Sequence, residues 1–99
     1  MKTVDNLNVG DVCYWFSGHG EFEREVKVSS IKVDDKYYRI KIEFQGIVVA
    51  RKNDTYGESV DFPGKLCFFS KESAVKYFIN NIERTISILK DSIVTLFNN

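Results

Sequence analysis

The hydrophobic pattern of this chain changes its period once, at Ser70. Before Ser70, β-branched and aromatic residues alternate with polar ones, which is the period-2 pattern of strands. After Ser70, aliphatic residues recur every three or four positions, as on one face of a helix. A chain of 99 residues has room for one core. The pattern therefore predicts one domain over 1–99, with a β part over 9–69 and a helix over 70–97.

Five segments before Ser70 have strand character. In the clearest, YYRIKIEF, every second residue from Tyr38 to Phe44 is apolar and the other face is largely charged. In FEREVKVSSIKV the apolar residues change face near Ser29 and Ser30, and a β-bulge there would restore a common face. Residues 52–65 are expected to form loops. The five segments are residues 9–16, 22–33, 37–44, 47–51 and 66–69.

The segment after Ser70 has a helix start signal and a heptad pattern. Ser70 is a good N-cap, and Glu72 lies in the first turn, where the helix dipole favours an anion. Two alternatives stay open: a break at Asn80–Asn81, and a strand over Thr85–Ile88 because β-branched residues disfavour helices. One heptad core position holds Ile79, Ile86 and Ile93, and the other holds Val75, Ile82, Leu89 and Leu96.

The order of these elements predicts the fold class. Short antiparallel strands followed by one helix indicate an α+β fold. We expect a small, five-stranded, partly open antiparallel β-barrel with a long C-terminal helix covering its open end. Hydrophobic residues make up 43% of the chain, and one proline is present. This composition is typical of a chain that folds around a core without a metal or disulfide.

The chain resembles small uncharacterised proteins of bacterial phages and other mobile elements. These proteins run Val-Gly-Asp-x-Val-Tyr, then a bulged Val-x-x-Ile strand, then Val-Phe-x-Thr-Lys-Glu-Glu-Ala at the start of a helix. The matching segments here are VGDVCYWF, VKVSSIKV, YYRIKIEF and LCFFSKESAVKYF, within residues 9–78. The resemblance implies a barrel of the Src-homology-three type, a C-terminal helix and a mobile-element origin. It implies no common activity, and the helix is longer here.

Charge and cysteine usage exclude some classes of function. Fourteen basic residues balance fourteen acidic ones, so bulk charge does not predict a polyanion binder. The two cysteines have no CxxC spacing, and the N-terminus lacks an apolar signal region. No 18-residue apolar run is present. We expect a cytoplasmic protein without a membrane partner, located in the host cytoplasm if a phage encodes it.

The segment CYWFSGHGEF concentrates reactive groups without predicting a reaction. His19 between two glycines is expected to be a turn residue, because no neighbour is placed to orient it as a base. Cys13, Cys67 and His19 do not have the paired spacing of zinc ligands, so the cysteines are expected to be buried. No catalytic motif is visible. We therefore expect no enzyme activity, cofactor or metal.

Neighbouring aromatic residues on strands must point to opposite faces, so some of them are left outside the core. Such residues are favoured anchors for protein partners, unless the helix covers them. Basic residues near Tyr37 permit an alternative, a nucleic-acid-binding barrel, but acidic neighbours offset their charge. The candidate binding residues are Tyr14, Trp15, Phe16, His19, Tyr37 and Arg39.

The predicted helix is too long for a small barrel. At 1.5 Å per residue it would reach roughly 40 Å, so its far half either folds back at Asn80–Asn81 or pairs with a second chain. Pairing would use Ile79, Ile82, Ile86, Leu89, Ile93 and Leu96. We expect a homodimer that binds a host protein, such as an enzyme or defence protein that it inhibits. Regulatory nucleic-acid binding is the second hypothesis, and binding of a nucleotide-like small molecule is the third.

Overall fold

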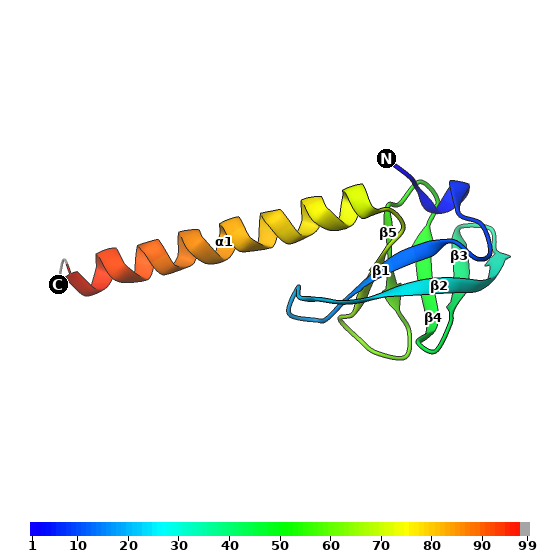
Figure 1. Ribbon diagram of the computed structural model, residues 1–99, viewed down its shortest axis with the longest axis horizontal. Helices are drawn as coiled ribbons and strands as arrows, with labels where there is room; N and C mark the ends of the chain where they lie inside the picture. Colours follow the sequence, from blue (N-terminus) through cyan, green and yellow to red (C-terminus); the bar gives the residue numbers. More distant parts are fainter. Residues whose placement is uncertain (98–99) are drawn as a thin grey trace.

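In the computed structural model, which describes residues 1–97, six antiparallel strands close into a barrel from which one helix projects (Figure 1). The helix extends so far beyond the barrel that the molecule measures 56 × 25 × 24 Å. The elements are the 3-10 turn η1 (Val4–Asn6), β1 (Val12–Phe16), β2 (Phe22–Val33), β3 (Tyr37–Ile42), β4 (Gly46–Arg51), β5 (Tyr56–Ser59), β6 (Leu66–Phe68) and α1 (Lys71–Phe97).

The α+β class and the small antiparallel barrel are confirmed, but the expected five strands and open edge are wrong. The missed strand, β5, pairs with both β4 and β6, and β6 in turn pairs with β1. Its sequence, YGES, has no alternating apolar pattern, so backbone pairing on both sides defines it. At Gly57 a Cβ atom would collide with Val48, so a side chain would obstruct this close approach.

The strands β2 and β3 test the predicted register. The bulge is confirmed, because Val28 pairs with Ile42 whereas Ser30 pairs with Lys41, which leaves Ser29 as the extra residue. The inward face of β3 includes Ile40 and Ile42, both buried. Phe44 was expected on that face, and this is wrong. It lies in the β3–β4 turn with a φ of 65° and is 92% exposed.

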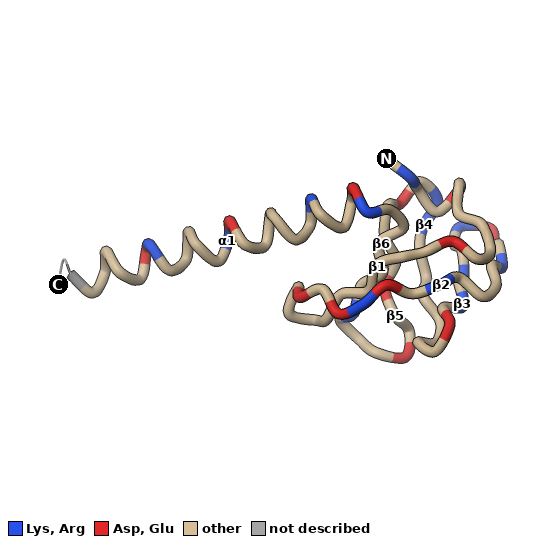
Figure 2. The backbone as a smooth tube through the Cα atoms, in the orientation of Figure 1, with Lys and Arg blue, Asp and Glu red and all other residues tan. Residues whose placement is uncertain are grey.

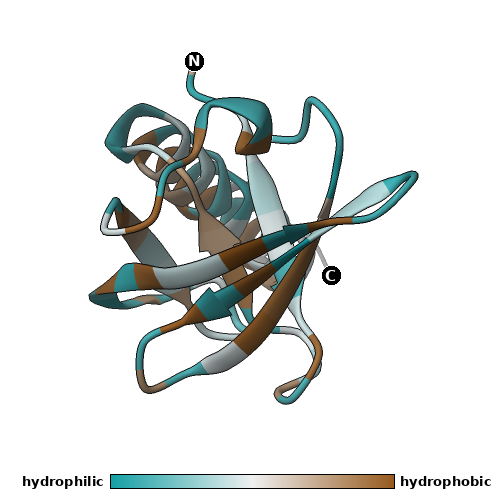
Figure 3. Ribbon diagram, turned by 90° about the vertical axis from the view of Figure 1, so that its right-hand side faces the viewer, coloured by the Kyte–Doolittle hydropathy of each residue, from teal (hydrophilic) through white to brown (hydrophobic). Residues whose placement is uncertain are grey.

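The barrel interior contains aromatic, aliphatic and cysteine side chains. Trp15, Ile40 and Val48 are completely buried there. The turn η1 adds Val4 and Leu7 to this cluster, and the Val4 N–H donates to the Asp54 carbonyl over 2.8 Å. Figure 3 views the barrel from the end opposite the helix, with η1 below the N-terminus. The N-terminal segment therefore completes the core, and the expectation that α1 covers an open barrel end is wrong.

The helix α1 is continuous from Lys71 to Phe97, so the break at Asn80–Asn81 and the strand over Thr85–Ile88 are wrong. The N-cap is confirmed, because Ser70 Oγ accepts the Ser73 N–H over 3.2 Å. Three hydroxyl side chains, those of Thr85, Ser92 and Thr95, donate to the carbonyl four residues earlier. These bonds satisfy their polar groups inside the helix.

A hydrogen-bond cluster around Asp5 joins η1 to the barrel. Asp5 Oδ1 accepts the Tyr38 hydroxyl over 2.9 Å, and Oδ2 accepts the Asn53 N–H over 2.7 Å. These bonds favour the charged carboxylate, so the Tyr38 hydroxyl first and the Asn53 N–H second hold the pKa of Asp5 below its usual value. The same contact raises the pKa of Tyr38, because ionisation would remove the donor.

Asp5→Asn tests this cluster through the pH dependence of stability. A lowered folded-state pKa contributes stability above the unfolded-state pKa of 3.8, and this stability is lost as pH falls through the folded-state pKa. We therefore expect the variant to be less stable than the wild type at pH 7, with the difference shrinking towards about pH 2. Urea unfolding at each pH measures it. Asp35→Asn, in the exposed β2–β3 turn, is the control, and an equal difference at every pH would contradict the prediction.

Candidate protein-binding surface

The alternation of side chains on β1 divides its aromatic residues between two clusters. Trp15 lies in the barrel interior and is completely buried, whereas Tyr14 and Phe16 point outwards. The strand β6 alternates in the same way, with Cys67 inside and Leu66 and Phe68 outside. Because β1 and β6 pair, their outer faces form one apolar surface. Another element must pack on this surface to bury it from solvent.

The first two turns of α1 supply that cover. Ala74 is buried against Phe16 and Phe68, and Tyr77 packs beside them. The Tyr77 ring meets Phe16 edge to face at a centroid distance of 5.2 Å and Phe68 at 4.7 Å. Aromatic pairs with these geometries contribute stability beyond their buried area. One further contact follows, in which Asn81 Nδ2 donates to the Gly20 carbonyl over 3.5 Å.

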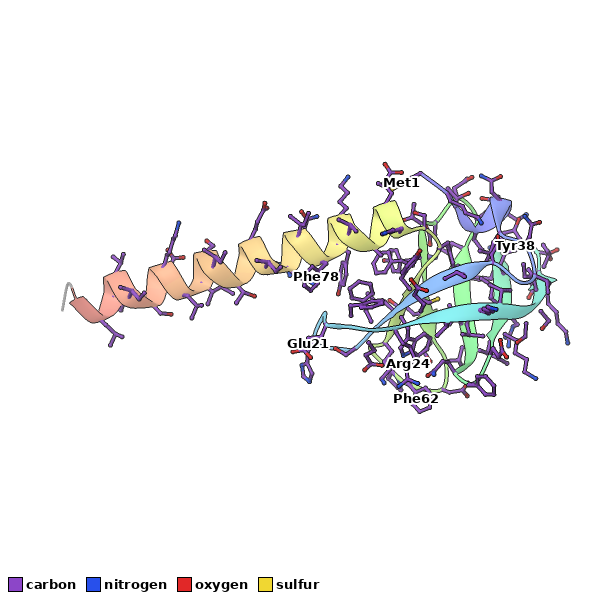
Figure 4. The ribbon with its side chains drawn as sticks, viewed as in Figure 1. Met1, Glu21, Arg24, Tyr38, Phe62 and Phe78 are labelled. Carbon is purple, nitrogen blue, oxygen red and sulfur yellow. The ribbon has the colours of Figure 1, made fainter. Side chains whose placement is uncertain are left out.

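A groove of about 310 Å³ runs between α1 and the β1–β2 hairpin. In Figure 4, Phe78 lies on the lower side of α1, where the hairpin approaches it. Phe22 and Phe78 are 48% and 42% exposed, so the groove wall is apolar and open to a partner. We call this the hairpin groove. It is lined by Tyr14, Phe16, Phe22, Ala74, Val75 and Phe78, with Glu25 and Lys71 as its charged members.

Within residues 1–97, no element covers the remainder of α1. All residues from Ile82 to Leu96 are exposed. Successive helical residues are about 100° apart, so Val75 lies about 100° around the helix from Ala74 and about 160° from Tyr77. The side that contains Val75 has the seven aliphatic residues of the heptad pattern, and we call it the stripe: Val75, Ile79, Ile82, Ile86, Leu89, Ile93 and Leu96. It is continuous with the hairpin groove, because Val75 belongs to both.

The structure separates the candidate binding residues predicted from the sequence. Trp15 is unavailable as a surface anchor, because it is completely buried in the barrel interior, and its Nε1 has no hydrogen-bond partner there. Phe16 is 1% exposed under α1. Tyr14 is half-buried in the hairpin groove. His19 is exposed in the β1–β2 turn, and its backbone N–H donates a hydrogen bond to Ser17 Oγ over 3.2 Å.

Tyr37 and Arg39 belong to a different surface. Both are exposed on β3, which β2 separates from β1. Tyr37 lines a second depression between β3, β4 and β5, which also contains Arg51, Asp54 and Glu58. Figure 2 shows basic and acidic residues interspersed over the barrel strands. The predicted set therefore does not form one site.

The predicted set omits several exposed aromatic residues, among them Phe78 in the hairpin groove, Phe22 and Phe44. Phe22 pairs with Phe16 across the β1–β2 hairpin, and their ring centroids are 5.7 Å apart. Antiparallel pairing over the five-residue connection would have indicated this neighbour. Phe44 stands at the tip of the β3–β4 turn with a left-handed backbone, which is unusual for a bulky residue. No periodic signal distinguishes it from the residues of β3.

Cys13 and Cys67 are both completely buried and lie next to each other inside the barrel. Their mutual hydrogen bond, and then burial, raise the pKa of the Cys67 thiol well above its usual value. The predicted burial of both cysteines is confirmed. Within residues 1–97, no group of three or more His, Cys, Asp or Glu side chains is placed to hold a metal ion.

Comparisons of the chain with protein-family models, with curated proteins and with solved structures found no match. In the described part of the chain, no helix combines the length and the apolar character needed to cross a membrane.

Thiol labelling tests the cysteine environment. Both thiols are buried away from the reagent, and the raised pKa of Cys67 also lowers its fraction of thiolate, the reactive form. We expect iodoacetamide to leave Cys13 and Cys67 unmodified in the native protein at pH 8 and to modify both in urea, as measured by intact mass. Labelling of native Cys67 at the rate of a free thiol would contradict the placement of β6 in the barrel.

Proposed function

We propose that this chain is a non-enzymatic protein-binding module of a phage or other mobile element that self-associates through α1. The observation that carries the proposal is the stripe, an aliphatic face on a helix that leaves the barrel after two turns. Apolar surface of this extent on a soluble chain marks a contact site. Its heptad spacing favours another helix as the occupant.

The energetics support pairing of the part of the stripe beyond Val75. Its residues are between 42% and 76% exposed. Burying half of such a side chain contributes roughly 1 kcal/mol, so the six residues from Ile79 to Leu96 in both chains contribute on the order of 12 kcal/mol. Association costs about 4–15 kcal/mol in lost freedom of motion. A stable dimer therefore requires most of the stripe in both chains.

The partner protein is proposed to dock on the barrel side, at the hairpin groove. Phe22 and Phe78 offer exposed aromatic surface, and Glu25 and Lys71 offer charges of both signs. An apolar centre with a polar edge is the usual composition of a protein interface. The resemblance to mobile-element proteins makes a host enzyme or defence protein the proposed target, and inhibition the proposed effect.

Nucleic-acid binding is the alternative function. Tyr37 and Arg39 are both exposed on β3, and Lys32 pairs with Arg39 from β2. An aromatic residue beside basic side chains is the arrangement that single-stranded nucleic acids require. Binding of this kind weakens steeply with added salt, because it releases counterions. A titration with labelled single strands at low and high salt distinguishes it from protein binding.

Ile86→Glu tests self-association. A charge in the middle of the stripe would have to be buried on pairing, so we expect the dimer to dissociate at concentrations where the wild type is paired. Sedimentation equilibrium measures the mass. Ser87→Glu places the same charge away from the stripe and is expected to leave the dimer intact. A monomeric wild type at every accessible concentration would remove self-association from the proposal.

The paired substitution Phe22→Ser with Phe78→Ser tests the hairpin groove. Both side chains are partly exposed, so the variant is expected to keep its fold, as circular dichroism would verify. A host protein captured by the wild type is expected to be lost from the variant. Phe62→Ser, at a 47% exposed aromatic residue outside the groove, is the control. Equal capture by all three chains would place the contact elsewhere.

A further inference from the structure

We propose that two copies pair through α1 in an antiparallel coiled coil, in the register that places Ile79 opposite Leu96 of the second copy. This inference rests on the proposed self-association and specifies its geometry. The core layers are then Ile79 with Leu96, Ile82 with Ile93 and Ile86 with Leu89, each occurring twice by symmetry. All six layers are aliphatic, and every member is exposed in the single chain.

The residue types of the stripe favour the antiparallel arrangement. Parallel two-stranded coiled coils combine a β-branched residue at one core position with leucine at the other. In the first half of this stripe both positions are β-branched, because Val75 and Ile82 stand where leucine would be expected. In an antiparallel pair each layer combines the two positions. Ile79 then faces Leu96 and Ile86 faces Leu89. Each of these layers occurs twice, so four of the six layers combine an isoleucine with a leucine.

The charges beside the stripe select the register. In the proposed register Glu83 of each copy flanks Lys90 of the other, which gives two pairs of opposite charge. Sliding one helix by a heptad, so that Val75 faces Ile93, also gives six layers. That register, however, places Glu83 beside Glu83 and Lys76 beside Lys90. In a parallel pair Lys71 would flank Lys76, and neither Glu83 nor Lys90 would face a charge. Only the proposed register combines six layers with complementary flanking charges.

The position of the barrel limits further sliding. A second slide in the same direction would leave four layers and would carry the end of one helix a full heptad past Lys71, where the other chain has no helix. A slide in the opposite direction also reduces the number of layers. The proposed overlap runs from Ile79 to Leu96, so along the axis it shares with the barrel contacts of α1 only the segment up to Asn81. Val75 lies outside the overlap and remains in the hairpin groove.

The inferred dimer is a rod with one barrel at each end. The helical overlap of 18 residues is about 27 Å long, and the two hairpin grooves stand beyond its ends. Pairing through α1 therefore leaves both grooves open to partner proteins. A bivalent binder of this kind can engage two copies of one target.

Charge reversal tests the register. Glu83→Lys and Lys90→Glu each create two like-charged pairs, so we expect each variant to raise the dimer dissociation constant roughly threefold to tenfold. The double variant Glu83→Lys/Lys90→Glu restores opposite charges and is expected to return to the wild-type value. In a parallel dimer the two effects would simply add. In the register one heptad away Lys90→Glu would tighten the dimer, so either result overturns the proposal.

Cross-linking gives an independent readout. We expect a short bismaleimide to link an equimolar mixture of Glu83→Cys and Lys90→Cys chains into covalent dimers. It should not link Glu83→Cys chains alone, because their thiols would be staggered by nine residues, about 13 Å, along the axis. The native cysteines are buried and do not interfere. Linking of Glu83→Cys by itself would indicate the register one heptad away. A wild type that dimerises but gives no mixed cross-link would overturn this inference alone, whereas a monomeric wild type would overturn the proposed self-association as well.

Discussion

The packing of Tyr77 on Phe16 and Phe68 fixes how the two parts of this molecule relate. In the closed barrel the paired residues Trp15 and Cys67 point inwards, and strand alternation turns Phe16 and Phe68 outwards. These outer rings would remain in water without Ala74 and Tyr77. The helix consequently starts against the barrel wall and continues past it, and the stripe faces solvent along the rest of its length (Figure 1).

Local patterns in the sequence were sufficient for the bulge at Ser29, the cap at Ser70 and the helical spacing of the aliphatic residues. Each depends on neighbours within a few positions along the chain. The strand β5 was missed because it is defined by hydrogen bonds to β4 and β6, which are distant in sequence. Phe44 was misplaced because a turn residue of left-handed conformation interrupts an otherwise regular alternation.

The sequence predicted the residues of the candidate site less well than it predicted the fold. Alternation showed that Trp15 and its neighbours lie on opposite faces, but it did not identify which face is interior. The structure places Trp15 in the barrel interior and Tyr14 and Phe16 in the outer cluster that packs against α1. Tyr37 and Arg39 were predicted to belong to the same binding site as Tyr14, but β2 lies between their strand, β3, and β1. The stripe was predictable as a set, because its spacing alone puts its residues on one side of a helix.

Because α1 is anchored to the barrel only at its N-terminal end, a small change in its angle there gives a large displacement of its far end. Among the described residues, its contacts with the barrel end at Asn81, and the side chains from Ile82 to Leu96 are exposed. A tilt of about 5° at the Tyr77 contact would displace the far end of a 40 Å helix by roughly 3 Å. The packing of Tyr77 on Phe16 and Phe68 therefore determines the direction of α1 and the position of the stripe several turns away. A change of side-chain volume at Phe16 or Phe68 would move the stripe, although neither residue contacts it.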